Sequence, residues 1–547
     1  MSDSAVVPDV IAVIGAGTMG AGIAQLAAQT GARTLLHDPV PEALERGVAG
    51  IGKVLDRLAT KGKITAEDAA AIHGRISPAA TLADLAGAGL VIEAAPERLQ
   101  IKLDLFNALA EILDDDAILA TNTSSLSVTE IAASTPNPSR VVGLHFFNPA
   151  PIMRLVEVVA GEQTADRAVH IARATGEAMG KHVVDAADVA GFLVNRVNRP
   201  YSLESLKLLQ ERVGSVEQID RICRRAGGFR MGPFELMDLI GIETNHAVAE
   251  SFHRQSYGEP RYQPSPLAAR KIAAGTLGRK TGSGWYAYAE DTPHRPDDTD
   301  PPTAGAGEGR TIAIVGDLPV AAELRAAAGD AGFSVVDGGA GGAGAGAGDA
   351  GGGGADASAA RDGGADADHA AAGDAWLVLD VRCDDTTPLP TGPRVVSLHR
   401  GSLHALAPTA AGFHAIAPLD AARLIEVTST PSSDPIAVER LTAFLAAIGR
   451  HAEPVQDAPG LVAGRIVAQL INEAAFLIGE GNGSPEDVDA GLRLGVNHPQ
   501  GPVAWADRLG LAHVVAILDA LHREQGEERY RVAPLLRRRL AVGGGLA

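Results

Sequence analysis

The sequence predicts an α/β domain with a parallel sheet, an all-helical domain after it, and then a degenerate second copy of the same two-domain unit. Short apolar runs alternate with helical periods in the first part of the chain, a pattern typical of parallel strands joined by crossover helices. From about Val189 the pattern changes to long helical periods. A series of short motifs then returns in the same order, which indicates an internal duplication rather than a short-period solenoid.

The first domain is expected to contain five short strands, because five apolar runs of strand length occur there. A helical period over residues 18–32 lies between the first two runs. In the helical domain the longest periods cover 191–212 and 216–226, and this domain is expected to end near Tyr288. The expected strands are 10–14, 33–37, 90–94, 117–121 and 140–144.

The duplication rests on pairs of matching segments that keep their order along the chain. The two copies share strand-like runs, a Gly-x-His motif and the start of a long helix. Residues 11–15 (Ile-Ala-Val-Ile-Gly) are matched by 312–316 (Ile-Ala-Ile-Val-Gly), 143–145 (Gly-Leu-His) by 412–414 (Gly-Phe-His), 156–158 (Val-Glu-Val) by 425–427 (Ile-Glu-Val), 191–196 by 460–465, and Gly232-Pro233 by Gly501-Pro502.

Changes of composition indicate the domain boundaries. Residues 290–309 are rich in Pro, Asp, Gly and Thr, which is typical of a linker. Residues 338–373 are mostly Gly, Ala and Asp and contain no Leu, Ile, Val or aromatic residue. They cannot bury enough apolar area to offset an ordering entropy of roughly 1–2 kcal/mol per residue, so we expect disorder. The expected units are 1–187 (α/β), 188–288 (helical), 289–309 (linker), 310–455 (second α/β, with the insert 338–373) and 456–547 (second helical).

The composition is ordinary for a globular chain, with a strongly acidic balance. Of the 547 residues, 46% are hydrophobic and 21% are charged, and 47 Lys and Arg against 67 Asp and Glu give a net charge of −20. Such a charge excludes a general nucleic-acid binder and a polybasic membrane-surface protein. No run of eighteen apolar residues is present, so no membrane-spanning helix is expected.

The N-terminus and the cysteines favour a cytoplasmic location. The first ten residues, MSDSAVVPDV, have neither a basic segment nor a long apolar one, so a secretory signal is not expected. Cys223 and Cys383 are the two cysteines of the chain, too few for a disulfide framework or a Cys-rich metal site. We therefore expect a reducing compartment and no bound metal.

The turn Gly15-Ala-Gly17-Thr-Met-Gly20 lies between a predicted strand and a predicted helix, the setting of a Rossmann-type dinucleotide-binding turn. Gly15 permits the tight turn, Gly17 lets a pyrophosphate approach the backbone, and Gly20 allows close packing of helix on strand. Asp38 follows Gly20 by eighteen residues, at the end of the next strand. Its carboxylate can accept from both ribose hydroxyls and would repel a 2′-phosphate, which favours NAD. The alternatives are a structural glycine turn and a surface aspartate.

A histidine and a glutamate form a second candidate constellation. His145, within Gly143-Leu-His145-Phe-Phe-Asn148-Pro149, follows an apolar run, and Glu157 lies twelve residues later in another. We expect two neighbouring strand ends joined by a turn. A carboxylate bonded to one imidazole nitrogen fixes the tautomer and raises the basicity of the other. His414 and Glu426 keep the same spacing in the second copy, which indicates a coupling that is either catalytic or only structural.

Short polar side chains follow the strand that ends near Thr121. The run Thr121-Asn-Thr-Ser124-Ser125 carries hydroxyls and an amide at the carboxyl end of a strand, where an open α/β sheet presents its ligand site. Helix capping is the alternative for Ser125 or Ser127. Asn195 is a polar residue in a mostly apolar helix start, and hydrogen bonding on the helix face is its alternative.

Together these motifs resemble the L-3-hydroxyacyl-CoA dehydrogenase family, in order and spacing, from residue 10 to about 288. Residues 229–241 and the C-terminal Gly526-Glu-Glu-Arg-Tyr-Arg531 resemble its long bacterial branch, which includes the 3-hydroxyadipyl-CoA dehydrogenases of phenylacetate degradation and 3-hydroxybutyryl-CoA dehydrogenases. The segments that carry the resemblance are Gly15–Gly20, Glu93 and Glu97 with Lys102, Thr121–Ser125, Gly143–Pro149 with Glu157, Gly191–Arg196, Met231–Glu235 and Gly278–Tyr286.

The resemblance implies a reversible, NAD-dependent oxidation of (S)-3-hydroxyacyl-CoA to 3-oxoacyl-CoA, a reaction of fatty-acid β-oxidation. His145 would be the general base that takes the proton of the 3-hydroxyl group, and Glu157 would orient it and stabilise its imidazolium form. Ser124 would hydrogen-bond the substrate oxygen, and Asn195 would help to hold the acyl group. Asn148 would line the site near the nicotinamide and the substrate.

The resemblance also implies contacts to the cofactor and to coenzyme A. Glu97, Lys102 and Lys280 match family positions that contact NAD. The CoA tail would lie along the cleft between the sheet domain and the helical domain, with Ser124 and Lys53 as candidate contacts. The family's usual CoA-binding Ser and Lys near residues 50–60 have no other clear match here.

The acyl group stays open at this point. A distal carboxylate, as in 3-hydroxyadipyl-CoA, would need a cation. Arg154, Arg199 and Arg230 are the candidates, and a surface position is the alternative for each.

Two other functions compete with this one. A β-hydroxyacid dehydrogenase acting on free acids shares the Gly-x-Gly-x-Met-Gly turn but uses a catalytic Lys at the start of the long helix, and residues 191–197 contain no Lys. A non-catalytic structural homologue, as lens λ-crystallin is within the resembled family, would not need the residues proposed for catalysis. All four are present: Ser124, His145, Glu157 and Asn195.

The second copy is expected to be catalytically silent. Its turn, Gly316-Asp-Leu-Pro319-Val-Ala321, lacks the second and third glycines, and Pro319 removes a donor N–H. In the resembled family the helical domain commonly forms a dimer interface. We therefore expect a homo-oligomer, or a second helical domain packed on the first as a tethered pseudo-partner. The expected replacements are Gly401 or Ser402 for Ser124, Ala417 for Asn148 and Gly464 for Asn195.

Overall fold

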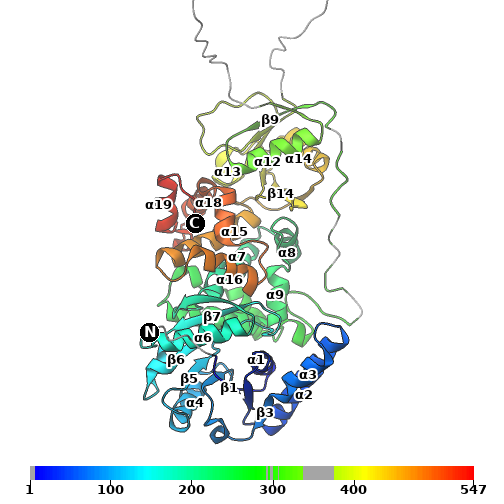
Figure 1. Ribbon diagram of the computed structural model, residues 1–547. Coiled ribbons are helices and arrows are strands. Elements are labelled where there is room, and N and C mark those ends of the chain that lie inside the picture. Colours follow the sequence, from blue (N-terminus) through cyan, green and yellow to red (C-terminus); the bar gives the residue numbers. More distant parts are fainter. Residues whose placement is uncertain (1–6, 291–292, 296–297, 299, 306, 337–374) are drawn as a thin grey trace, which may run out of the picture.

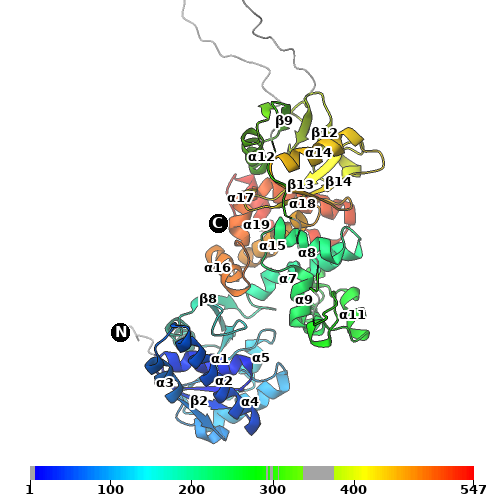
Figure 2. The same cartoon turned by 90° about the vertical axis from the view of Figure 1, so that its right-hand side faces the viewer.

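Two α/β units lie at opposite ends of the molecule, and the helical domains lie between them (Figure 1, Figure 2). The computed structural model describes residues 7–290, 293–295, 298, 300–305, 307–336 and 375–547. The expected disordered insert, 338–373, lies outside the described residues.

The first sheet has eight strands in the order β3-β2-β1-β4-β5-β6-β7-β8. Its central strands are apolar and buried on both faces, as helices covering both faces require. The strands are β1 (Val10–Ile14), β2 (Arg33–His37), β3 (Ile76–Ala79), β4 (Leu90–Glu93), β5 (Ile118–Thr121), β6 (Val141–Phe146), β7 (Leu155–Ala160) and β8 (His182–Ala187).

The parallel arrangement predicted for the five expected strands is confirmed, and the strand that carries Glu157, which was expected to follow a turn, is the exception. β6 and β7 are antiparallel, because the chain returns through the turn after Phe146 and not through a crossover helix. Two strands, β3 and β8, were not expected from the sequence. Both are edge strands: β3 contains Pro78, and β8 alternates between buried and exposed residues. Neither has the continuous apolar run of a central strand.

Six helices belong to this unit, and the glycine turn leads into the first of them. Ser127, not Ser125, caps α5, since its side chain accepts from the Glu130 N–H. The helices are α1 (Thr18–Gln29), α2 (Pro41–Thr60), α3 (Ala66–Gly74), α4 (Leu99–Ile112), α5 (Val128–Ala133) and α6 (Asp166–Ala178).

The helical domain that follows is built around one long helix, α7 (Val194–Gln210). Its apolar residues belong to the largest buried cluster of the protein, which includes residues of both helical domains. The remaining helices are α8 (Val216–Arg225), α9 (Pro233–Ile240), α10 (Ile242–Gln255) and α11 (Pro266–Ala273), with the single-turn helices η3 (Pro260–Tyr262) and η4 (Arg279–Thr281).

The second half repeats this plan with a sheet of seven strands in the order β10-β9-β11-β12-β13-β14-β15. Here too one pair, β13 and β14, is antiparallel. The strands are β9 (Thr311–Val315), β10 (Ser334–Val336), β11 (Leu377–Asp380), β12 (Arg394–Ser397), β13 (Ala411–His414), β14 (Leu424–Thr428) and β15 (His451–Pro454), and the helices of this unit are α12 (Pro319–Asp330), α13 (Leu403–Leu406) and α14 (Pro435–Ala447).

The second helical domain is also built on one long helix, α15, which packs along α7 at the centre of the molecule (Figure 1). No helix within the described ranges combines the length and the apolarity that a membrane span requires. The helices are α15 (Ala463–Gly479), α16 (Pro485–Gly495), α17 (Pro502–Leu509), α18 (Leu511–Gln525) and α19 (Pro534–Ala541), with the short η5 (Glu528–Tyr530).

Two reciprocal ion pairs join α7 to α15. Arg196 Nε donates to Glu473 Oε1 at 2.8 Å, and Arg465 Nε donates to Glu204 Oε1. Arg465 is the equivalent of Arg196 in the second copy, and Glu473 is the equivalent of Glu204, because both lie 269 residues later. The arginine of each copy therefore bonds the glutamate of the other copy. This is the pattern of an interface with two-fold symmetry.

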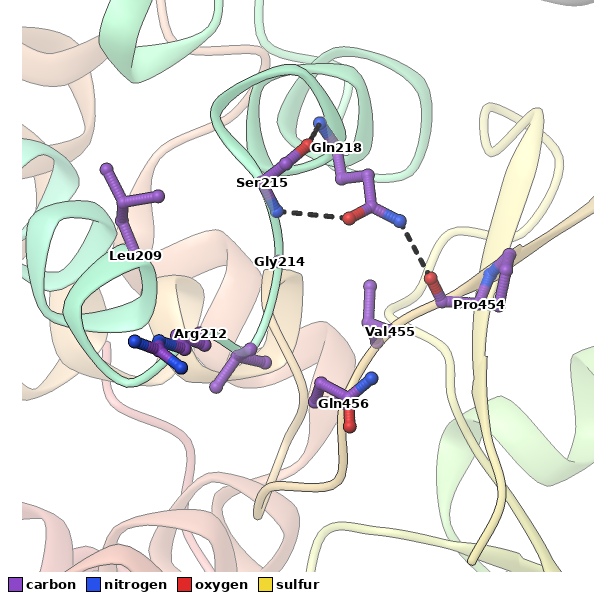
Figure 3. Close-up of a pocket in the computed structure, with 9 residues that line it drawn as sticks. Leu209, Arg212, Gly214, Ser215, Gln218, Pro454, Val455 and Gln456 are labelled. Carbon is purple, nitrogen blue, oxygen red and sulfur yellow. Dashed lines mark hydrogen bonds between the residues drawn. The ribbon is translucent and has the colours of Figure 1, made fainter.

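Each helical domain also contacts the α/β unit of the other half. α16 lies against β7 and β8, and α8 lies against β14. A cavity of about 330 Å³ lies beside the second of these contacts, between residues 209–218 and the segment 454–456 at the end of β15. Figure 3 shows Gln218 spanning it: its side-chain amide accepts from the Ser215 N–H at 3.0 Å and donates to the Pro454 carbonyl at 2.9 Å.

Candidate active site

The glycine turn between β1 and α1 is crowded at two glycines and open at the third. A Cβ added at Gly15 would lie 2.5 Å from the carbonyl oxygen of Ala94, and a Cβ added at Gly20 would lie 1.7 Å from the carbonyl oxygen of Gly15. At Gly17 it would meet nothing within 4 Å, so a ligand can approach the backbone there. α1 starts without a side-chain cap and without an acidic residue in its first turn, which leaves its N–H groups available to phosphate.

Asp38 lies beside this turn and is held by two backbone donors. Its Oδ2 accepts from the Ala16 N–H at 2.8 Å, and its Oδ1 accepts from the Val40 N–H at 2.9 Å. The carboxylate is therefore fixed next to the turn and keeps lone pairs for ribose hydroxyls. These residues fit a dinucleotide with a free 2′-hydroxyl, because a 2′-phosphate would meet a like charge.

His145 and Glu157 face each other across the antiparallel strands β6 and β7. His145 Nδ1 lies 2.5 Å from Glu157 Oε2, and both side chains are buried. The bond requires the proton of the neutral ring on Nδ1, which leaves Nε2 as the acceptor. The rings of Phe147 and Phe192 lie 4.6 Å and 5.8 Å from the imidazole, centre to centre, and limit its motion.

The other oxygen of Glu157 holds the start of α7. Oε1 accepts the backbone N–H groups of Leu193 at 3.1 Å and Val194 at 2.8 Å, so the carboxylate caps the helix as well as orienting the imidazole. This brings Asn195, in the first turn of α7, towards the histidine. Phe192, just before the helix, has φ +53°, a strained conformation for a side chain of this size.

A network that runs from the buried Lys102 and Glu93 to the more exposed Glu97 positions Ser124 after β5. Glu97 Oε1 accepts from the Ser124 N–H at 2.8 Å and from the Ser125 N–H at 3.0 Å, and Lys102 Nζ lies 3.3 Å from Glu97 Oε2. Lys102 also donates to Glu93 at 2.6 Å. Burial raises the pKa of Glu97, but the Lys102 ammonium and these hydrogen bonds outweigh it and leave the pKa below its ordinary value.

Two site residues were missed in the sequence. Asn122 Oδ1 accepts from the Phe146 N–H at 2.7 Å and so ties the end of β5 to the end of β6. Gln255, at the end of α10, donates to the Ser125 carbonyl at 2.6 Å and closes the helical domain onto the sheet. Asn122 lies inside a motif already singled out, whereas Gln255 lies 130 positions from its partner and carries no local signal.

The sequence matches two profiles of one family. The profile "3-hydroxyacyl-CoA dehydrogenase, NAD binding domain" covers residues 10–189, and "3-hydroxyacyl-CoA dehydrogenase, C-terminal domain" covers residues 191–288 and again 460–544. The chain belongs to the 3-hydroxyacyl-CoA dehydrogenase family. It is an NAD-dependent oxidoreductase, and the double match of the C-terminal profile agrees with the duplication.

The similarity to members of this family extends over the whole chain. The 3-hydroxyadipyl-CoA dehydrogenase of Escherichia coli K12 is 35% identical over 535 residues, 98% of each chain. The crystal structure of a 3-hydroxybutyryl-CoA dehydrogenase from the same species covers 98% of this chain, with a TM-score of 0.78 at 34% identity. A probable 3-hydroxybutyryl-CoA dehydrogenase of Deinococcus radiodurans is 43% identical over 276 residues, 99% of its own length and 50% of this chain.

The remaining residues predicted from the family resemblance lie farther from the histidine. Asn148 is exposed in the loop after β6. Lys280 lies in the helical domain and is paired with Glu243 of α10. Lys53 is exposed on α2. The structure thus brings His145 and Glu157 together and places Asn195 in the first turn of the helix that Glu157 caps, while Ser124 follows the neighbouring strand β5. Neither Lys53 nor Lys280 has a contact to them in the described part of the chain.

The second copy keeps the histidine and the glutamate of this family but not their bond. His414 Nε2 lies 3.0 Å from His513 Nε2, while Glu426 accepts from the N–H groups of Val462 and Ala463. The His414 ring occupies the space that an asparagine would need, because a Cβ added at Gly464 would lie 2.1 Å from its Cε1 atom. Burial lowers the pKa of His414 and raises the pKa of Glu426 to about 8.

The expectation that Gly401 or Ser402 takes the place of Ser124 is wrong. Thr121 pairs with Gly143 in the first sheet, and Val396 pairs with the equivalent Gly412 in the second, so Thr121 and Val396 are equivalent. Ser124 lies three residues after Thr121, and the residue three positions after Val396 is His399. Ser402 instead precedes α13 as Ser127 precedes α5. A buried histidine therefore fills the position that Ser124 has in the first half.

Proposed function

We propose that this chain oxidises (S)-3-hydroxyacyl-CoA thioesters to 3-oxoacyl-CoA with NAD, reversibly, at a single site in its first half. The observation that carries the proposal is the bonded pair of His145 and Glu157, next to Ser124 and at the carboxyl edge of the sheet that holds the glycine turn. Bound NAD would supply the hydride acceptor. All other steps fall to side chains of the chain.

In this proposal His145 Nε2 takes the proton of the 3-hydroxyl group. Glu157 holds the opposite nitrogen and stabilises the imidazolium that forms, the role of an orienting carboxylate in general-base catalysis. The burial of both groups strengthens their interaction, because little water competes for it. The two phenylalanine rings keep the imidazole aimed at the substrate.

Ser124 would donate a hydrogen bond to the substrate oxygen, and Asn195 would help to hold the acyl group. Glu97 and Lys102 would act on the site through Ser124, since Glu97 binds the Ser124 backbone, and would contact NAD from the same place. Asn148 and Lys280 would line the cofactor side of the site. Lys53 would meet the CoA tail at the outer edge of the cleft between sheet and helices.

We further propose that the second half is a silent, tethered pseudo-partner of the first. The reciprocal pairs of Arg196 with Glu473 and Arg465 with Glu204 support this interpretation. So do the contacts of α16 with β7 and β8. Cys223 and Cys383 are both free, which is compatible with a reducing, cytoplasmic compartment.

An absorbance assay at 340 nm tests the reaction class. We expect NADH to be consumed when acetoacetyl-CoA is added, and no comparable rate with free acetoacetate. A rate with free acids alone would support a β-hydroxyacid dehydrogenase. The absence of turnover with either, together with intact NADH binding, would support a non-catalytic homologue.

A further inference from the structure

Arg199 is a buried cation without a partner. Only 7% of the residue is exposed, and its Nε and Nη1 atoms are fully buried without a hydrogen-bond partner among the described residues. Burial lowers the pKa of Arg199 to about 10, so the guanidinium is charged at neutral pH. An uncompensated buried charge is strongly destabilising, so an anion that bonds to Nε and Nη1 would be bound favourably here.

The other arginines of this region are either paired or exposed. Arg196, one turn earlier on α7, is bonded to Glu473 and Glu480. Arg154 and Arg230, the two further candidates for a substrate carboxylate, are both exposed. Of the three candidates from the sequence, Arg199 alone is buried.

Arg199 lies on the face of α7 that carries Asn195. The two residues are four positions apart, so their side chains are neighbours on the helix surface. This face is turned towards α10: a Cβ added at Gly191 would lie 1.8 Å from Phe252 Cζ, and Arg199 Cζ lies 5.1 Å from the centre of the same ring. The aromatic ring gives the cation a partial contact but no opposite charge.

α10 connects this position to the catalytic residues. Gln255, one turn beyond Phe252, donates to the Ser125 carbonyl, next to Ser124. Arg199 lies one turn beyond Asn195 on α7, about 6 Å from it along the helix axis, and faces Phe252 of α10. A substrate whose acyl group is held by Ser124 and Asn195 would direct the end of its chain to this place.

The silent half provides an internal control for this arginine. Shifting by the same 269 positions that relate Arg196 to Arg465 places Ala468 at the position of Arg199. Ala468 is 1% exposed and lies on α15, the counterpart of α7. The fold thus accepts a small apolar residue here. The buried cation occurs only in the half that has the catalytic constellation.

We propose that the Arg199 guanidinium binds a carboxylate at the far end of the acyl chain, so that the site selects dicarboxylic 3-hydroxyacyl-CoA thioesters. A guanidinium presents planar paired donors that match a carboxylate, and its free Nε and Nη1 supply them. In a six-carbon dicarboxylic chain the carboxylate lies three carbons beyond the hydroxyl carbon. This inference rests on the proposed function, because it takes the reacting carbon to lie between His145 and Ser124.

The experiment compares two CoA thioesters with six-carbon chains, 3-hydroxyadipyl-CoA and 3-hydroxyhexanoyl-CoA, which differ in the terminal carboxylate. The wild-type protein should prefer the first. Arg199→Met should lower the ratio of the two kcat/KM values by about 10- to 100-fold, the worth of a charge-assisted hydrogen bond. The value for the hexanoyl substrate should rise, since an apolar side chain replaces the cation. Arg199→Lys should keep part of the preference, and the exposed Arg230→Met is the matched control, which should keep all of it.

A second pair of substrates separates the acyl carboxylate from the phosphates of coenzyme A. The same acyl groups are offered as N-acetylcysteamine thioesters, which lack the nucleotide. The fall in the ratio should persist with them. A fall that occurs only with the CoA thioesters would assign Arg199 to the nucleotide and overturn the proposal.

Two further outcomes are decisive. A wild-type protein that oxidises both thioesters equally, or an Arg199→Met protein that loses both by the same factor, overturns the role of Arg199 and leaves the reaction class intact. Lack of turnover of either substrate contradicts the proposed function instead. In that case the carboxylate preference can be measured without turnover, by calorimetric titration with 3-oxoadipyl-CoA and 3-oxohexanoyl-CoA. Equal affinities for these two compounds would overturn the inference.

Discussion

The pair of His145 and Glu157 and its counterpart in the second half share one contact and differ in another. In both, the glutamate of the antiparallel strand accepts the first N–H groups of the long helix, from Leu193 and Val194 in the first half and from Val462 and Ala463 in the second. Only the first half adds a bond from that glutamate to the histidine. The retained His and Glu spacing is thus explained by the glutamate–helix contact, whereas the glutamate–histidine bond is specific to the half proposed to be catalytic.

The strained residue before the long helix belongs to the shared part. Phe192 has φ +53° and Leu461, its counterpart, has φ +47°. Because the silent half keeps this conformation, it belongs to the way the chain enters the helix under the glutamate, and it is not specific to catalysis.

Removal of the second half is expected to have the largest effect. Truncation after Tyr288 would expose the face of α7 that packs on α15, and Arg196 would lose both of its carboxylate partners. We expect aggregation or a new homodimer through this face, measured by light scattering after size-exclusion chromatography. A soluble, equally stable monomer would contradict the pseudo-partner proposal.

His145→Gln should lower kcat by about 10²- to 10⁴-fold, the usual cost of losing a general base. NADH binding, followed by fluorescence titration, should remain almost intact. His414→Gln is the matched control in the second half and should leave kcat unchanged. A rate within a few-fold of wild type for His145→Gln would show that another group is the base, and a large loss for His414→Gln would show that the second half is not silent.

The cofactor preference should depend on the turn that only the first half retains. We expect one NADH per chain by equilibrium dialysis, and NAD to be preferred over NADP by on the order of 1–3 kcal/mol in kcat/KM, through a like-charge contact and a lost ribose bond. Asp38→Ser should remove most of this preference. Equal efficiency of the wild-type protein with both cofactors would rule out this role for Asp38.

The smallest effect is expected at Glu426, through the pH dependence of stability. Burial raises the pKa of Glu426 from 4.5 to about 8, so the folded state holds its proton more tightly than the unfolded state. The stabilisation is present below about pH 4.5 and is lost as the pH rises through 8. Glu426→Gln loses one of the two acceptors for the N–H groups of Val462 and Ala463, so its Tm should lie below that of wild type at pH 5. Because Gln has no proton to lose, this deficit should shrink by a few degrees between pH 5 and pH 9. Parallel Tm curves for the two proteins would show that Glu426 is not neutral in the fold.

The glycine turn, Asp38 and the His145–Glu157 pair could be found from the sequence, because each depends on a short motif next to an apolar run. The edge strands β3 and β8 could not, since neither is buried on both faces. His399 was missed because the copies differ in length: Ser127 to Gly143 spans sixteen positions, whereas Ser402 to Gly412 spans ten. The second copy is shorter between these two points, so counting from the Ser127 equivalent, Ser402, places the Ser124 equivalent at the wrong residue.

Arg199 shows a different limit. Three arginines near the site are equivalent by charge, and only tertiary packing distinguishes the buried one from the two at the surface. Its lack of a partner is a property of everything around it, including residues more than fifty positions away on α10. Local sequence patterns carry no such information.

The covalent link between the two halves has an evolutionary consequence at the α7–α15 contact. In an assembly of two identical chains every mutation appears on both sides of the contact, so a change that suits one active site is imposed on the other. In this protein a mutation changes only one of the two halves, so it appears on one side of the α7–α15 contact. One half can carry Arg199 where the other carries Ala468, and Asn195 where the other carries Gly464, without any compromise between them. The fused gene can therefore specialise one active site while the other is free to decay.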